Sequence, residues 1–222
     1  MTGAQIVERG WATIAVVSCD SASESALHPD ERSRARGMSE LRRRTFVAGR
    51  VALREALAHR GLDADRPIDS DDRGAPRFVG ARVSISHKED VAVGLVVADD
   101  DAQHVGIDVE DLAPLKIDIA PKILTKDELE SLEGAVRGGA RRDALVRTAF
   151  SMKEAIYKAI DPVLRRYVGF REVEVLLGAP LGLVRPRLCL ARDGDALDAA
   201  RLSVESFPAP HEDVVLSVAR LR

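Results

Sequence analysis

The feature that most constrains the fold is a self-similarity between the two halves of the 222-residue chain. The segment 82–85 (RVSI) is similar to 201–204 (RLSV), and the segment 89–96 is similar to 212–219. In the first pair apolar and polar residues alternate, which is typical of half-buried strands, whereas in the second pair a continuous apolar run predicts a more buried strand. A turn joins the two strands of each half into a hairpin. Because any two hairpins look alike, the hairpins alone leave chance similarity open.

A long helical segment precedes each hairpin. Setting Phe46 against Phe150 aligns the two helical segments and places Arg50 opposite Glu154. The offset is 104 residues between the helices and about 120 between the hairpins, so one half carries an insertion. We therefore predict an α+β fold: a pseudo-dimer of two similar α+β subdomains, each a small antiparallel sheet packed on a long helix.

Three consecutive aspartates at 99–101 mark the predicted boundary between an N-terminal subdomain (1–101) and a C-terminal subdomain (102–222). Shared sites in such pairs lie between the copies. We expect the active site there, with arginine from the first copy gripping phosphate and carboxylates from the second copy holding a metal.

The segment 105–111 (VGIDVED) has strand periodicity, with Val105, Ile107 and Val109 on one face. Asp108 and Glu110 then project together from the other face. Two neighbouring carboxylates repel each other, and they are tolerated when they are solvated, neutralised by basic groups or bound to a hard cation. A solvated acidic strand is the simpler interpretation of this segment alone.

The segment Arg141–Ile160 is predicted to be a helix that ends near Asp161-Pro162. Its apolar residues recur at helical spacing, and Glu154 and Lys158 lie one turn apart on the side opposite to Met152. A solvated Glu–Lys pair explains this pattern without any chemistry. Together with the carboxylates of 105–111, however, Glu154 becomes a candidate third ligand.

Composition excludes several classes of protein. A net charge of −3 gives no global basic field for nucleic acid, and no apolar run approaches the length of a membrane span. The N-terminus lacks the pattern of a signal peptide, and two scattered cysteines form no metal or redox motif. We therefore expect a cytoplasmic protein that binds neither nucleic acid nor membrane.

The paired motifs G-I-D-V-E (106–110) and F-S-M-K-E-A-I-Y-K-A (150–159) resemble the signature pair of the 4'-phosphopantetheinyl transferases. The resemblance is to the larger, single-chain class, and it extends from about Arg42 to the end of the sequence. It implies Mg²⁺-dependent transfer of 4'-phosphopantetheine from coenzyme A to a serine of an apo carrier protein, with release of adenosine 3',5'-bisphosphate. Mn²⁺ is an alternative metal. The class implies a monomer.

The resemblance also assigns roles to residues of the second half. Asp108, Glu110 and Glu154 match the metal ligands, a donor set of carboxylate oxygens that suits Mg²⁺. Glu154 is also a candidate catalytic base, directly or through a water. Lys158 matches the lysine that neutralises charge on the diphosphate, and Lys153 is expected to contact phosphate as well.

In the first half, the resemblance implies contacts with coenzyme A for Arg42, Arg50, Arg73, Ser86 and His87. From the residues alone, the arginine-rich face of the helix that carries Arg42 and Arg50 is either solvated or a phosphate clamp, since Arg offers forked donors that match phosphate oxygens. At Arg73 the sequence departs from some relatives, which place a lysine where Ala75 stands. Glu128 completes a capping box with Thr125, which explains it without a catalytic role.

Acyl, peptidyl and aryl carrier proteins are all possible acceptors, and the segment 161–170 favours nonribosomal peptide, polyketide or siderophore synthesis, pathways that include antibiotic biosynthesis. We expect acidic carriers to be steered by basic residues around the helix that follows Thr125, namely Lys122, Lys126, Arg137, Arg141 and Arg142. Two alternatives remain: a non-catalytic relative that binds coenzyme A or a carrier, and a Mg²⁺-dependent phosphohydrolase or nuclease.

Overall fold

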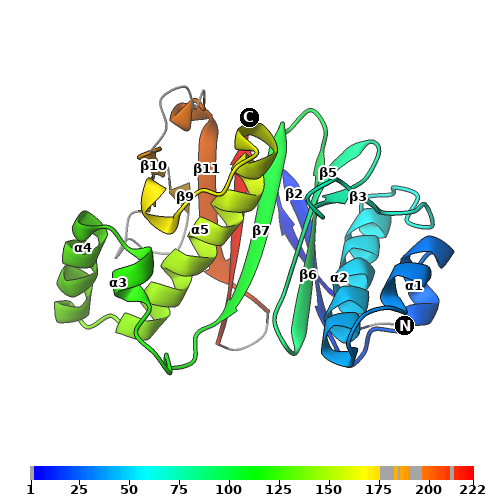
Figure 1. Ribbon diagram of the computed structural model, residues 1–222, viewed down its shortest axis with the longest axis horizontal. Coiled ribbons are helices and arrows are strands. Elements are labelled where there is room, and N and C mark those ends of the chain that lie inside the picture. Colours follow the sequence, from blue (N-terminus) through cyan, green and yellow to red (C-terminus); the bar gives the residue numbers. More distant parts are fainter. Residues whose placement is uncertain (1–2, 176–182, 185, 191–196, 211–212) are drawn as a thin grey trace. The chain divides into compact units, whose positions relative to one another are not determined.

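The structure is a computed structural model that describes residues 3–175, 183–184, 186–190, 197–210 and 213–222. The chain divides into two compact units, Met1–Gln103 and His104–Arg222 (Figure 1). The predicted boundary, after Asp101, lies two residues before this division. Each unit has its own sheet and its own long helix.

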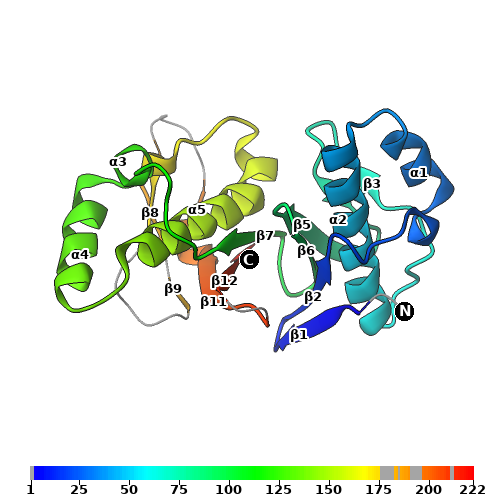
Figure 2. The same ribbon diagram turned by 90° about the horizontal axis from the view of Figure 1, so that it is seen from below.

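Unit 1 is built on a four-stranded antiparallel sheet with the strand order β1-β2-β6-β5. The strands are β1 (Gln5–Arg9), β2 (Ala12–Ser18), β5 (Ala81–His87) and β6 (Val91–Ala98). The helix α2 (Glu40–His59) packs against one face of this sheet (Figure 2). The short elements are η1 (Glu24–Ala26), α1 (Pro29–Ala35) and the paired two-residue strands β3 (Asp69–Ser70) and β4 (Pro76–Arg77).

The helix α2 lies unusually close to β6 because Gly94 has no side chain. A Cβ atom at Gly94 would lie 2.4 Å from the backbone nitrogen of Leu53 and 2.5 Å from its Cα. Leu53 and Leu57 are fully buried, and they pack with Ala15, Val96 and other apolar residues of the sheet. These residues form a core between α2 and the sheet.

Unit 2 has the strand order β7-β12-β11-β9, again antiparallel. These strands are β7 (His104–Asp111), β12 (Val214–Leu221), β11 (Leu202–Pro208) and β9 (Leu183–Val184). The helix α5 (Arg142–Leu164) packs across β7 and β12 (Figure 1). The remaining elements are α3 (Ala120–Ile123), α4 (Lys126–Arg137), η2 (Phe170–Glu172), η3 (Ala199–Arg201) and the pair β8 (Val173–Glu174) and β10 (Arg187–Leu188).

The predicted fold class, two similar α+β units, is confirmed. Both units contain a first strand, a long helix and then a hairpin whose second strand pairs with the first strand: β2, α2 and β5–β6 in unit 1, and β7, α5 and β11–β12 in unit 2. Among the described residues, no helix is long and apolar enough to cross a membrane.

Three details differ from the sequence prediction. The helix α5 continues past Pro162 to Leu164, because a proline in the last turn removes only one hydrogen bond, and it ends at Arg165 in the left-handed conformation (φ 48°). Low periodicity and the residues Pro67, Gly74 and Pro76 favour a loop over 63–80, but this segment contains β3 and β4. The sequence pattern predicts no strand at β1, and it predicts a strand near 172–177, part of which lies outside the described residues.

Candidate active site

The carboxylates of β7 face the helix α5. Gly106 marks this face, since a Cβ atom there would lie 2.0 Å from the carbonyl oxygen of Ala155 and 2.9 Å from the Lys158 side chain. Strand alternation places Asp108 and Glu110 on the same face as Gly106. Both are buried, with exposed fractions of 5% and 7%.

Glu154 meets these two residues from the helix side. Burial raises the pKa of its half-buried carboxyl, the nearby Lys158 lowers it, and Asp108 and Glu110 raise it further. The two β7 carboxylates are therefore close enough to disfavour a third negative charge. The structure brings together, within unit 2, all three carboxylates that the sequence singled out.

Two basic side chains of α5 pair with the β7 carboxylates. Lys158 Nζ donates to Asp108 Oδ1 at 2.9 Å and to the carbonyl oxygen of Ile107 at 2.8 Å. Arg147 Nη1 lies 3.4 Å from Glu110 Oε2 and 3.2 Å from Asp111 Oδ1. Sequence reasoning missed Arg147. The signal was its position on the same helical stripe as Glu154 and Lys158, seven and eleven residues before them.

The donor set fits a hard dication, because three carboxylates supply oxygen ligands that Mg²⁺ accepts. Among the described residues, no group of three or more His, Cys, Asp and Glu side chains is arranged as a ready-made metal site. Lys158 contacts Asp108 Oδ1 and Arg147 contacts Glu110 Oε2, so each basic group occupies a β7 carboxylate oxygen that a metal would use.

Lys153 has partners other than the predicted phosphate. Its Nζ atom donates to Glu128 Oε2 at 2.7 Å and to the carbonyl oxygens of Ile123 at 2.8 Å and Phe170 at 2.9 Å. An ammonium group has three protons, and these acceptors use all of them. The side chain is 1% exposed, and burial lowers its pKa.

A small pocket opens beside Glu154. It is lined by Lys153, Glu154, Tyr157, Tyr167, Val168, Gly169, Phe170 and Val173. The rings of Tyr157 and Tyr167 are 6.4 Å apart, and Tyr167 is 72% exposed. The pocket therefore offers an aromatic wall next to a carboxylate.

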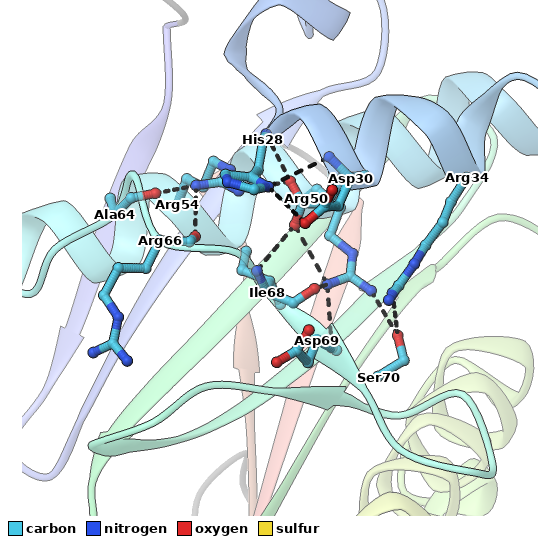
Figure 3. A network of polar contacts seen from close by, with 11 residues as sticks. His28, Asp30, Arg34, Arg50, Arg54, Ala64, Arg66, Ile68, Asp69 and Ser70 are labelled. Carbon is cyan, nitrogen blue, oxygen red and sulfur yellow. Dashed lines mark hydrogen bonds and ion pairs between the residues drawn. The ribbon is translucent and has the colours of Figure 1, made fainter.

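In unit 1, Arg50 is buried rather than presented to solvent. Its polar contacts are drawn in Figure 3. Its Nη1 atom donates to the carbonyl oxygen of Ile68 at 2.8 Å, and its Nη2 atom donates to Ser70 Oγ at 3.1 Å. The guanidinium also lies 3.6 Å from Glu31 and 5.2 Å from the centre of the Phe46 ring. Arg50 thus fixes the segment that leads into β3.

Arg54 extends the same network (Figure 3). Its Nη2 atom donates to Glu31 Oε2 at 2.6 Å, and its Nη1 atom donates to the carbonyl oxygens of Ala64 and Arg66. Glu31 is 1% exposed and also accepts the backbone N–H of Ile68 at 3.3 Å. One carboxylate and two guanidiniums thus hold the segment 64–70 on the helix.

The other predicted coenzyme A contacts of unit 1 lie on α2, on the turn between β3 and β4, and at the end of β5. Arg42 is exposed near the start of α2, and Arg73 is exposed on the turn between β3 and β4. Ser86 and His87 are adjacent at the end of β5, where Ser86 is buried and His87 is exposed. Three of these four side chains are therefore accessible to an anionic ligand.

Two family models match the chain. The model of the 4'-phosphopantetheinyl transferase N-terminal domain matches residues 30–97, and the model of the 4'-phosphopantetheinyl transferase superfamily matches residues 104–196. Among curated proteins, the chain is 30% identical over 167 residues to the 4'-phosphopantetheinyl transferase Svp of Streptomyces mobaraensis and 31% identical over 149 residues to Npt of Nocardia iowensis.

These two alignments cover 74% and 67% of this chain, and 66% and 65% of the relatives, so the chain spans slightly less than two thirds of their length. A solved structure, a holo-(acyl-carrier-protein) synthase from Bacillus anthracis in complex with CoA (3',5'-ADP), matches with 27% identity and a TM-score of 0.35. That match covers 42% of this chain and 96% of the synthase chain.

Proposed function

Because the chain belongs to the 4'-phosphopantetheinyl transferase superfamily, we propose that it transfers the 4'-phosphopantetheine group of coenzyme A to a serine of an apo carrier protein. The observation that supports this most is the packing of α5 on β7. It places Glu154 and Lys158 of the helix next to Asp108 and Glu110 of the strand. In the reaction, the serine oxygen bonds to the pantetheine-side phosphorus, and the bond from that phosphorus to adenosine 3',5'-bisphosphate breaks.

Glu154 is our proposed base, which accepts the proton of the serine hydroxyl. A carboxylate can take this proton directly or through one water if it lies within hydrogen-bond reach of the hydroxyl. Asp108, Glu110 and Glu154 would hold Mg²⁺, which when bound would neutralise negative charge on the diphosphate. Lys158 would turn its ammonium group from Asp108 to the diphosphate, where charge develops during transfer.

The phosphates of coenzyme A would meet the accessible basic groups of unit 1, Arg42, Arg73 and His87, with the hydroxyl of Ser86 nearby. We propose a role for Arg50 that differs from the contact with coenzyme A expected from the sequence. Its buried contacts with Ile68 and Ser70 hold the segment that precedes Arg73, so it would position the nucleotide contacts without touching phosphate. The buried contact of Lys153 with Glu128 likewise favours a structural role over contact with phosphate.

The acceptor side would lie around α4 and the start of α5. Lys122, Lys126, Arg137 and Arg141 are exposed there, and exposed basic residues steer an acidic partner by long-range attraction. We keep the predictions of a monomeric cytoplasmic protein, and of a carrier from nonribosomal peptide, polyketide or siderophore synthesis. The aromatic pocket beside Glu154 suits the amide and aliphatic groups of the pantetheine arm.

The test is the intact mass of apo carrier proteins after incubation with the enzyme, coenzyme A and Mg²⁺. We expect a gain of one phosphopantetheine group, which EDTA and Glu154→Gln abolish and Glu130→Gln does not, since Glu130 is exposed on α4. No gain on peptidyl, aryl or acyl carriers would contradict the proposal. Binding of coenzyme A without transfer would instead favour the non-catalytic relative, and release of inorganic phosphate or cleaved nucleic acid would favour the hydrolase.

A further inference from the structure

Arg147 holds one of the three carboxylates through a set of contacts that also fixes the chain after β7. Its Nε atom donates to the carbonyl oxygen of Ala113 at 2.8 Å, and its Nη1 atom lies 3.4 Å from Glu110 Oε2 and 3.2 Å from Asp111 Oδ1. A third contact, from Nη2 to the carbonyl oxygen of Pro114, is 3.5 Å long. The guanidinium is thus bound on three sides.

This ion pair is shielded from water, because the side chains of Arg147 and Glu110 are only 15% and 9% exposed. Charges in such a place are screened far less than charges on the surface, so a guanidinium here acts strongly on any cation beside Glu110. A dication that takes Glu110 as a ligand must share the carboxylate with Arg147 or displace it.

We propose that Arg147 is a positioning residue that keeps Glu110 in place and lowers the intrinsic affinity of the candidate site for a divalent cation. This inference rests on the proposed function, which makes Glu110 a metal ligand. It predicts that the cation binds weakly to the enzyme alone and more tightly together with coenzyme A, whose diphosphate adds the negative charge that offsets Arg147. Because coupling is reciprocal, the cation raises the affinity for coenzyme A by the same factor.

Lys158 and Arg147 differ in this respect. Lys158 donates to Asp108 and to the backbone carbonyl of Ile107, and the proposed mechanism moves it to the substrate. Arg147 has two backbone carbonyl partners and two carboxylates, and a guanidinium keeps its charge at any physiological pH. Arg147 is therefore the charge that remains beside the cation throughout the reaction.

The test is titration with Mn²⁺, with free Mn²⁺ measured by electron paramagnetic resonance, in the presence and absence of coenzyme A. Without coenzyme A, we expect Arg147→Met to bind Mn²⁺ about tenfold more tightly than the wild type, because a nearby positive charge has been removed. The gain in Mn²⁺ affinity from coenzyme A should be smaller in this variant. Arg147→Lys keeps the charge and should stay close to the wild type.

Arg142→Met is the matched control. It removes the same charge from the same helix, but Arg142 pairs with Asp118 and its side chain is 34% exposed, so solvent screens it. We expect no change in Mn²⁺ affinity. If Arg147→Met proves too unstable to titrate, Arg147→Gln keeps amide donors for the carbonyl contacts and should show the same tightening.

Three results would overturn the inference. One is unchanged or weaker Mn²⁺ binding by Arg147→Met or Arg147→Gln in an enzyme that transfers phosphopantetheine, which would leave the proposed function standing. Another is a rise in Mn²⁺ affinity for Arg147→Lys equal to that for Arg147→Met, because the loss of positive charge would then not explain the tighter binding. The third is a wild type that neither binds Mn²⁺ with coenzyme A nor modifies any carrier, which would remove the proposed function as well.

Discussion

Units 1 and 2 each hold a buried glutamate against the long helix, but with different basic partners. In unit 1, Glu31 follows the N-cap His28 of α1, accepts the His28 backbone N–H at 3.0 Å, and binds Arg54 at 2.6 Å. It also accepts the N–H of Ile68, which lies beyond α2 in the chain.

Glu128 of unit 2 repeats this arrangement. It accepts the backbone N–H of the α4 N-cap Thr125 at 2.8 Å and that of Val175, beyond α5 in the chain, at 2.8 Å. Its basic partner on the long helix is Lys153, at 2.7 Å. In both units a capping-box glutamate thus connects a short helix, the long helix and the segment after it, a correspondence that supports duplication of one ancestral unit.

The two groups, Glu31 with its arginines and Glu128 with Lys153, differ in whether the basic side chain can lose its proton. Arginine keeps its proton under all relevant conditions, whereas a buried lysine can become neutral. Unit 1 therefore fixes two permanent charges around Glu31, and unit 2 fixes one charge that can be removed. The comparison also shows where unit 1 uses two of its arginines: Arg50 and Arg54 hold their own unit together.

The largest effect is expected from removing the two glutamate charges. Glu31→Gln should cost about 3–5 kcal/mol of unfolding free energy, because buried cations lose their counter-ion. Glu128→Gln should cost less. With Glu128 gone, the pKa of Lys153, already lowered by burial, falls further below its unfolded value, so the cost shrinks as pH rises from neutral toward the unfolded pKa of lysine.

Urea unfolding at several pH values measures both changes. Glu130→Gln, which breaks the exposed pair with Lys126, is the control and should change stability by less than about 0.5 kcal/mol. Equal and pH-independent costs for Glu31→Gln and Glu128→Gln would show that the two clusters do not differ as proposed.

The next largest effects are expected from alanine substitutions at Gly94 and Gly106, the strand glycines that lie against α2 and α5. Gly106→Ala places a methyl group 2.0 Å from the Ala155 carbonyl oxygen, and Gly94→Ala places one 2.4 Å from the Leu53 nitrogen, so each should cost about 1–3 kcal/mol. Chemical denaturation measures these losses, and Gly106→Ala should also weaken the proposed transfer because it moves α5 away from β7. Gly134→Ala, on an exposed turn of α4 with open space, should stabilise by about 0.5–1 kcal/mol. A tolerated alanine at 94 or 106 would contradict the close helix–strand contact.

The smallest expected effect is that of Glu154→Gln, which should raise the stability of the fold while it abolishes the proposed activity. The folded pKa of Glu154 is raised above its ordinary value of 4.5, so its ionised form destabilises the fold at any pH above that value. In metal-free buffer, Glu154→Gln should therefore melt at a higher temperature than the wild type at pH 7, and the difference should vanish below pH 4.5. Thermal melting across this range is the measurement. A lower melting temperature at pH 7 would mean that the glutamate stabilises the fold, contrary to its burial beside Asp108 and Glu110.

Local periodicity was enough to place the carboxylates of unit 2 on facing surfaces. Alternation in β7 sets Asp108 beside Glu110, and helical spacing sets Glu154 beside Lys158. The same rules could not foresee the burial of Arg50 or Lys153, because their partners Glu31 and Glu128 come from other helices. The capping box at Thr125 even concealed the second partner of Glu128, since it already gave that side chain a complete local explanation.

The pairing of β7 has a consequence for the order in which the chain folds. The described strand that pairs with β7 is β12, through residue pairs that run from Asp111–Val214 to His104–Leu221 and are thus 103 to 117 positions apart. In unit 1, every strand of the sheet is available once residue 98 has been made. Distant strand pairing is slow, and domains fold from the N-terminus during synthesis. We therefore expect the half that carries Asp108, Glu110 and Glu154 to form last, because its strand β7 pairs with β12 only after the end of the chain has been made.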